Sequence, residues 1–168
     1  MILENDNFML NSDNPLINAL REQLGLDSKT LHDLQTFDPS RITSPLEMKD
    51  AQKWVETLHT RKGTPIGIIP DYDADGVLSG SLLYAALYEL GFEDVTLYPP
   101  RIDTGYGMSK QSVEELMELN PNIQTILTTD NGIAAFDGIK YAKELGLTVL
   151  VSDHHLGSED EPEFDVAV

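Results

Sequence analysis

The sequence contains no cysteine, so the chain forms no disulfide and offers no thiolate to a structural zinc site. This absence is consistent with a reducing compartment. No run of about 18 apolar residues is present, and the N-terminus lacks the basic and apolar segments of a secretory signal. The sequence therefore predicts a cytoplasmic protein without a membrane span.

Basic residues are also scarce. The chain has 11 Lys and Arg against 29 Asp and Glu, which gives a formal net charge of −18 over 168 residues. Proteins that bind nucleic acid tightly are usually basic, because the release of counterions from phosphates drives their affinity. We therefore expect most of the acidic residues to lie on a solvated surface, and we do not expect this chain alone to bind a long nucleic acid tightly.

The first 62 residues have a helical pattern. A first helix is predicted from Asn14, where a capping side chain and a proline precede an apolar stripe that ends at Gly25. A second helix is predicted over residues 28–36. A third begins near Ser44 and is predicted to bury Met48, Ala51, Val55 and Leu58 on one face. We interpret residues 1–62 as an N-terminal helical arm.

From residue 63 onward, short apolar segments alternate with helical ones. This alternation is typical of βαβ units, and it predicts an α/β fold with a parallel, doubly wound sheet of at least four strands and flanking helices. The hydrophobic content of 40% suffices for a single core in this domain, residues 63–168. The predicted strands are 65–70, 94–99, 123–129 and 147–152, and the predicted helices are 79–90, 109–119 and 134–145.

The segment "IIPDYDADGVLSG" follows the first predicted strand and holds Asp71, Asp73 and Asp75 at alternate positions. Carboxylates this close repel one another, so we expect a cation among them. An EF-hand calcium loop is excluded, because its twelfth position requires Glu and this chain has Leu82 there.

Two chemistries remain for this segment. A haloacid-dehalogenase-like phosphatase would use Asp73 as nucleophile and Asp75 as general acid. That enzyme class also needs a lysine motif and a final acidic pair, where this chain has "SDHH". The alternative is a hydrolytic site in which the carboxylates share divalent cations.

Every other predicted strand also leads into polar residues. Arg101 follows the second strand, Asp130 and Asn131 follow the third, and Asp153, His154 and His155 follow the fourth. In an open parallel sheet the functional site lies outside the carboxyl ends of the strands, so these side chains are expected to meet. Carboxylates with imidazole and no thiolate favour Mn²⁺ or Mg²⁺, and this number of carboxylates favours two ions.

The motifs "DYDADG", "RIDTGYG", "TTDNGI" and "SDHH" occur in the order found in the DHH phosphoesterase superfamily, which the chain resembles over about residues 14–168. The most similar branch is that of the single-strand-specific 5′→3′ DNA exonucleases, enzymes of DNA repair and recombination. The resemblance implies that the metal ligands are Asp71, Asp73, Asp75, Asp130 and His154, with Asp75 and Asp130 the best candidates to touch both ions. It implies that Asp153 orients the histidines, that His155 and Arg101 contact the scissile phosphate, and that Asn131 shapes the turn after the third strand.

The chain also departs from that superfamily in two respects. Branches that act on small phosphoesters or short oligonucleotides carry a His four residues before the equivalent of Asp73, where this chain has Ile69. Members of the exonuclease branch continue beyond "DVAV" with a further metal-binding Asp and a second domain. We therefore expect this chain to be the N-terminal part of such an enzyme, which acts on the 5′ end of single-stranded DNA and has a single-strand-binding protein as a candidate partner. A phosphoesterase for small substrates and a metal-binding fragment without activity are the alternatives.

Overall fold

The fold is described by a computed structural model that covers residue 25 and residues 50–99, 101, 107–157, 160 and 162–168. The helices predicted before residue 50 lie outside these residues, and the helical arm stays a prediction. All the helices and strands described below belong to one of the two units of the chain, Ser44–Val168. None of the described helices is long and apolar enough to cross a membrane.

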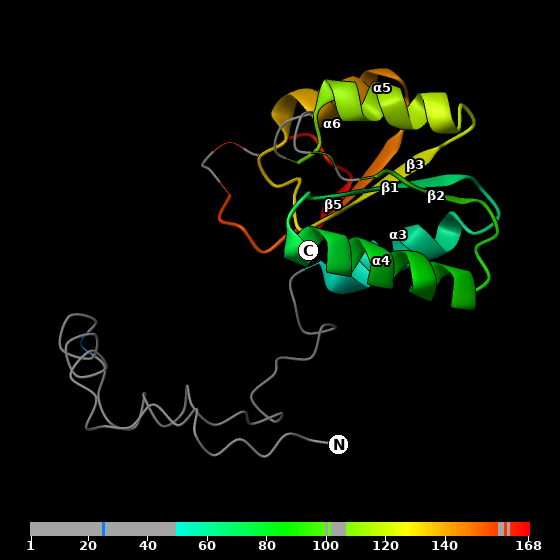
Figure 1. The fold of residues 1–168 in the computed structure, drawn as a ribbon, viewed down its shortest axis with the longest axis horizontal. Helices are drawn as coiled ribbons and strands as arrows, with labels where there is room; N and C mark the ends of the chain where they lie inside the picture. The colour runs from blue at the N-terminus through cyan, green and yellow to red at the C-terminus, as the bar shows by residue number, and fades with distance from the viewer. Residues whose placement is uncertain (1–24, 26–49, 100, 102–106, 158–159, 161) are drawn as a thin grey trace, which may run out of the picture. The chain divides into compact units, whose positions relative to one another are not determined.

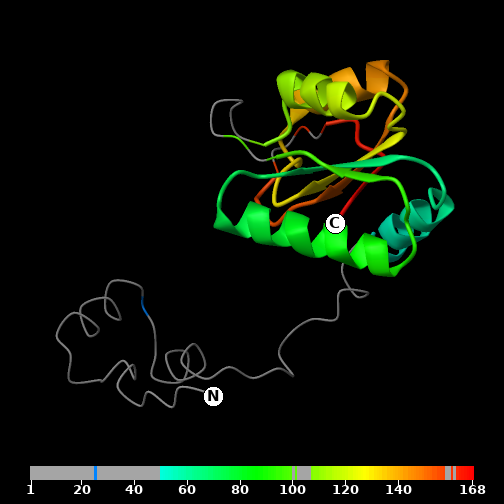
Figure 2. The same cartoon turned by 45° about the vertical axis from the view of Figure 1, so that its right-hand side comes forward.

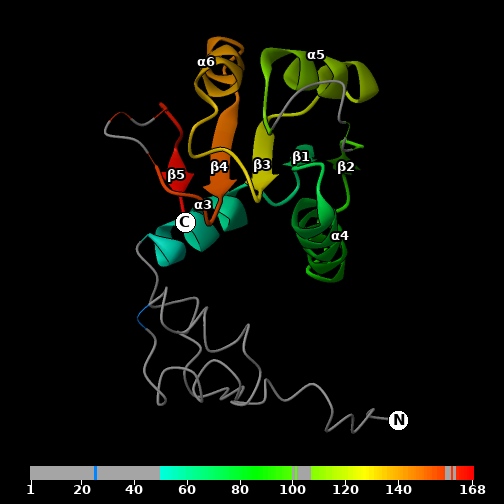
Figure 3. The same cartoon turned by 60° about the vertical axis from the view of Figure 1, so that its left-hand side comes forward.

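A sheet of five parallel strands forms the centre of this unit, in the spatial order β2-β1-β3-β4-β5 (Figure 3). The prediction of a parallel sheet with at least four strands is confirmed. Neighbouring strands pair residue by residue, so that Ile68 of β1 lies beside Leu127 of β3. The strands are β1 (Ile66–Pro70), β2 (Val95–Leu97), β3 (Thr125–Thr129), β4 (Thr148–Ser152) and β5 (Val166–Ala167).

Helices cover both faces of the sheet, with α5 and α6 on one face and α3 and α4 on the other (Figure 1). Alternate strand residues point to opposite faces, which divides the core in two. In β4, Val149 and Val151 pack with α5 and α6, whereas Leu150 packs with α3 and α4. The helices are α3 (Ala51–Thr60), α4 (Ala74–Glu89), α5 (Lys110–Leu119) and α6 (Phe136–Glu144).

The strand order reverses between β1 and β3. From β1 the chain crosses over α4 to β2 on one side, and it then returns over α5 to β3 on the other side of β1. At such a switch point the two crossover connections diverge and leave a crevice beyond the carboxyl ends of the two strands. Asp71 follows β1 and Asp130 follows β3, so both lie at this point.

Two helices differ from their predicted form. Helix α3 buries Trp54 together with Ala51 and Leu58, whereas Val55, expected in the core, is exposed. Helix α4 begins at Ala74, five residues before the predicted start. The Asp73 side chain caps it, because Oδ1 accepts hydrogen bonds from the N–H groups of Asp75 and Gly76, both at 3.0 Å.

Two glycines let α4 pass very close to the end of β1. A Cβ at Gly76 would lie 2.5 Å from the backbone oxygen of Asp71, and a Cβ at Gly80 would lie 2.7 Å from Cβ of Pro70. These glycines are one helical turn apart on the face of α4 that meets the strand. The close approach places the start of α4 directly beside Asp71.

We predict that Gly76→Ala destabilises the domain, because the added methyl group would collide with backbone that has no room to shift. Overpacking of this kind costs about 1–3 kcal/mol, which is more than the helix propensity that alanine gains over glycine, about 1 kcal/mol. Chemical denaturation of the variant and the parent measures the difference. The matched control is Gly157→Ala, whose Cβ would meet only Ile133 at an ordinary 3.4 Å. Equal unfolding free energies for Gly76→Ala and the parent would contradict the close approach.

Candidate metal centre

Two triads of candidate ligands meet at the carboxyl ends of the strands. In the first, ligand atoms of Asp71, Asp73 and Asp130 lie within 4.8 Å of one another. In the second, ligand atoms of Asp130, His154 and His155 do the same. Asp130 belongs to both triads.

Asp71 is almost completely buried, with 1% of its surface exposed. Its Oδ1 accepts a hydrogen bond of 3.3 Å from the N–H of Gly107. Its Oδ2 is buried and has no hydrogen-bond partner within the part of the chain that the structure describes. A buried carboxylate oxygen without a partner is costly, and a cation shared with Asp73 and Asp130 would satisfy it. This orphaned oxygen fits a divalent metal ion.

Asp73 and Asp75 differ in their surroundings, although both are exposed. Asp73 is the N-cap of α4, and Asp75 lies in the first helical turn. The alternate spacing of the three aspartates therefore does not reflect an extended strand. Asp75 belongs to neither triad, but it lines the same pocket as Asp130 and His154. The residue common to both triads is Asp130 alone.

Asp130 adopts a left-handed backbone conformation with φ of 62°, which Asp tolerates better than most residues. Its Oδ1 lies 3.0 Å from Nε2 of His154, whose side chain is largely exposed. Burial raises the pKa of the Asp130 carboxyl above its usual value, and the negative charge of Asp73 raises it further. A cation at this point would favour the charged form again.

Asp153 holds His155 and not His154. Its Oδ1 accepts hydrogen bonds from Nδ1 of His155 at 2.7 Å and from the His155 N–H at 3.1 Å, and its Oδ2 accepts one from the Ile133 N–H at 3.0 Å. Burial opposes ionisation, but these bonds outweigh it and lower the pKa of Asp153. The same contact raises the pKa of His155. The His155 ring is therefore oriented by a carboxylate, a common arrangement behind metal-binding imidazoles.

Asn131 is buried and connects three segments. Its Nδ2 donates to the carbonyl oxygens of Ile69 at 3.1 Å and Thr129 at 3.0 Å, and its Oδ1 accepts from the N–H of Met108 at 2.9 Å. The side chain thus ties the ends of β1 and β3 to the segment before α5. This amide is engaged in holding the edge of the site together.

Arg101 lies beyond β2 and is half exposed. Its Nη1 is 3.6 Å from Oε2 of Glu115 on α5, and the Tyr98 hydroxyl donates to the same oxygen at 2.6 Å. Glu115 also accepts a hydrogen bond of 2.9 Å from Gln111. The guanidinium group therefore stays near α5 while part of it faces solvent. Arg101 belongs to neither triad.

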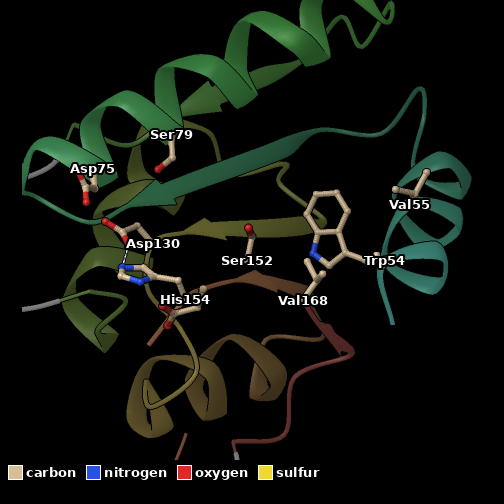
Figure 4. Close-up of a pocket in the computed structure, with 10 residues that line it drawn as sticks. Trp54, Val55, Asp75, Ser79, Asp130, Ser152, His154 and Val168 are labelled. Carbon is tan, nitrogen blue, oxygen red and sulfur yellow. Dashed lines mark ion pairs between the residues drawn. The ribbon is translucent and has the colours of Figure 1, made fainter. Parts of the chain in front are cut away.

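A pocket of about 550 Å³ opens onto the centre and extends to α3 (Figure 4). Its acidic end holds Asp75, Asp130 and His154, and its apolar end holds Trp54 and Val168. The pocket is also lined by Ser79, Ser152 and Trp54, to which the sequence interpretation gave no role, although Ser79 and Ser152 lie within the segments "IIPDYDADGVLSG" and "SDHH". Only the spacing of Ser79, one helical turn after Asp75, could have indicated it.

Solved structures with the same fold include a crystal structure of exonuclease RecJ bound to manganese. It matches with a TM-score of 0.64 and 30% identity, over 74% of this chain and 32% of that one. RecJ from Thermus thermophilus, solved in complex with Mn²⁺, matches with a TM-score of 0.60 and 28% identity, over 75% of this chain and 18% of that one.

Curated relatives carry the name single-stranded-DNA-specific exonuclease RecJ. The Haemophilus influenzae protein is 45% identical over 104 residues, which are 61% of this chain and 18% of that protein. The Bacillus subtilis protein is 33% identical over 156 residues, which are 89% of this chain and 19% of that protein. This chain thus spans about a fifth of the length of these relatives. The family model described as "DHH family, N-terminal domain" matches residues 65–168, and the chain belongs to the DHH family.

Proposed function

We propose that this chain is the N-terminal catalytic part of a metal-dependent phosphodiesterase that degrades single-stranded DNA from its 5′ end. The observation that carries the proposal is the pair of triads that share Asp130. Two cation positions joined by one carboxylate suit phosphoester hydrolysis, in which the attacking and the leaving oxygen both need stabilisation. The names of the relatives support DNA as the substrate.

Asp71, Asp73 and Asp130 would hold one ion, and Asp130 with His154 would hold the other, with Asp75 at the mouth of the same pocket. Carboxylate and imidazole ligands without thiolate favour Mn²⁺ or Mg²⁺, and the solved RecJ structures were determined with manganese. Bound there, such ions lower the pKa of a water molecule and neutralise phosphate oxygens.

The remaining residues act on the substrate or hold others in place. His155 belongs to the second triad and is oriented by Asp153, and it would contact a phosphate oxygen beside the ion that Asp130 and His154 hold. Arg101 would contact the scissile phosphate through its solvent-facing side, since a guanidinium group can donate two parallel hydrogen bonds to phosphate. Asn131 would keep the turn after β3 and the segment before α5 in register.

The complete enzyme would bind the 5′ end of a single strand, and a single-strand-binding protein is a candidate partner there. This chain has few basic residues to bind DNA, with 11 Lys and Arg against 29 acidic residues. The positive charge that binds DNA, and the segment that closes the pocket over it, would come from additional polypeptide of the kind that the longer relatives carry. The chain alone would therefore be a weak nuclease.

We predict that Mn²⁺ raises the melting temperature of the chain and that Asp130→Ala abolishes this effect, because Asp130 serves both positions. A ligand at about 100 times its Kd stabilises the folded state by about 2.7 kcal/mol. Differential scanning calorimetry with and without Mn²⁺ measures the shift. Glu118→Ala, an exposed carboxylate on α5, is the control and should keep the full response. An undiminished Mn²⁺ response in Asp130→Ala would rule out the assigned ligands.

We predict that Arg101→Ala weakens binding of a 5′-phosphorylated trinucleotide in Mn²⁺ by roughly ten-fold or more, in line with about 1.5–3 kcal/mol for hydrogen bonds to a charged group. Its Mn²⁺ affinity should stay within about two-fold of the parent, because an arginine offers no lone pair to a cation and Arg101 belongs to neither triad. Isothermal titration calorimetry measures both affinities, and Lys140→Ala on α6 is the matched loss of an exposed cation. A large loss of Mn²⁺ affinity in Arg101→Ala would contradict its role toward phosphate.

We predict that the chain digests a 5′-labelled 30-nucleotide single strand far more slowly than the complete Haemophilus influenzae relative, with residual Mn²⁺-dependent cleavage confined to oligonucleotides of a few residues. Repulsion between a body of charge −18 and a polyanion is strongest at low salt, so moderate salt should help this reaction. Gel assays over a series of salt concentrations test this. A complete absence of cleavage, even of dinucleotides, would favour the metal-binding fragment without activity, and processive digestion of the long strand would overturn the restriction to short oligonucleotides.

A further inference from the structure

Helix α4 is unusual in a protein of this charge. Its 16 residues include only two charged ones, Asp75 in its first turn and Glu89 at its end. The chain as a whole carries a net charge of −18. Helices on a protein surface normally have a polar outer face. An apolar helix of this length is usually buried on all sides.

The outer face of α4 is nevertheless exposed. Leu78 is 63% exposed, Leu82 is 72%, Tyr88 is 72% and Leu90, the C-cap, is 62%. Six of the twelve large hydrophobic residues that are exposed in the described part of the chain lie within residues 77–90. Large apolar side chains that gather on one exposed surface mark interaction sites. We refer to Leu78, Leu82 and Tyr88, which share one side of the helix, as the α4 face.

The geometry of the α4 face fits another helix. The inner side of α4 packs on the sheet through Gly76, Gly80 and Leu87, and none of the described helices or strands covers its outer side (Figures 1 and 2). Leu78 and Leu82 are one turn apart, and the small residues Ser81 and Ala85 lie between them and Tyr88. Small residues between large apolar ones form the grooves into which the ridges of a second helix pack.

Charge decides between the candidate occupants. The described residues of the α4 face offer no cation to nucleic acid, and Asp75 and Glu89 stand at the helix ends. A second copy of the chain would bring another net charge of −18 to the interface. An amphipathic helix with an apolar stripe and flanking Lys or Arg residues complements both features. The relatives are about five times longer than this chain and therefore contain polypeptide that could supply such a helix.

We propose that the α4 face is the docking surface for a basic-flanked amphipathic helix belonging to additional polypeptide of the kind that the longer relatives carry. Docking there has a consequence for the metal centre. Asp73 caps α4 and Asp75 lies in its first turn, so a helix packed along α4 would brace the end that bears both carboxylates. The docked helix thereby couples the rest of the polypeptide to the position of the metal ligands.

The absence of cysteine from the chain makes a direct test practical. Single variants Leu82→Cys and Tyr88→Cys report on the α4 face, and Leu119→Cys reports on α5, where Leu119 is exposed on the other side of the sheet. Each is made in this chain and in a chimera in which residues 65–168 replace the matched part of the Haemophilus influenzae relative, whose own cysteines are changed to serine. Maleimide labelling rates, followed by mass spectrometry, are compared between the two.

We expect labelling at both α4 positions to be at least 100-fold slower in the chimera than in the short chain, and labelling at position 119 to be equal in both. Equal rates at all three positions would overturn the proposal. Protection that already occurs in the short chain would also overturn the proposal: it would assign the face to a second copy if it increases with concentration, and to the N-terminal residues of the same chain if it does not.

If the chimera does not unfold cooperatively, and so is not properly folded, a peptide-binding measurement tests the docking surface instead. An 18-residue fluorescent peptide with leucines at helical spacing and flanking lysines is titrated with the short chain, alongside a peptide of the same composition in scrambled order. We expect the ordered peptide to bind at least ten-fold more weakly to Leu82→Asp than to the parent or to Leu119→Asp. Equal binding to all three proteins, or to both peptides, would overturn the proposal.

Discussion

Three carboxylates at the switch point of the sheet impose the main constraint on this domain. Ligand oxygens of Asp71, Asp73 and Asp130 lie within 4.8 Å of one another, so their negative charges repel. The fold brings them together through the parallel register of β1 and β3 and through the close approach of α4 to Pro70. The repulsion is relieved in part by the start of α4, whose N–H groups face Asp73, and by His154 beside Asp130. A divalent cation would relieve the rest.

The sheet and the location of the site could be predicted from the sequence because both follow from local patterns. Short apolar segments between helices define parallel strands, and polar residues after each strand must meet at one edge. The start of α4 could not be predicted from the same pattern. Alternate aspartates suggest an extended segment, but the hydrogen bonds that Asp73 accepts turn the chain into a helix at Ala74. The helical turn places Asp75 in the first turn of α4 and not on an extended segment beside Asp73. Asp75 therefore belongs to neither triad, and only Asp130 belongs to both.

Other features depend on contacts between distant segments, which one sequence does not encode in any periodic way. Helix α3 buries Trp54 where the sequence pattern predicted Val55, which corresponds to a small rotation of the helix about its axis. This rotation depends on how the helix packs on the sheet. Glycine is needed at positions 76 and 80 because a Cβ there would collide with the backbone of Asp71 and the side chain of Pro70. The sequence of α4 alone does not reveal these contacts. The link between Asp153 and His155 is local, and the family resemblance implied that Asp153 would orient both histidines, whereas its hydrogen bonds reach His155.

The buried amide of Asn131 has a consequence for the order of motions at this edge of the sheet. Its three hydrogen bonds reach the ends of two strands and the backbone at Met108. A local opening of the segment before α5 would leave the buried Oδ1 of Asn131 without the Met108 N–H, and an unsatisfied buried oxygen is costly. That segment and the strand ends carrying Asp71 and Asp130 therefore form one cooperative unit in native-state fluctuations.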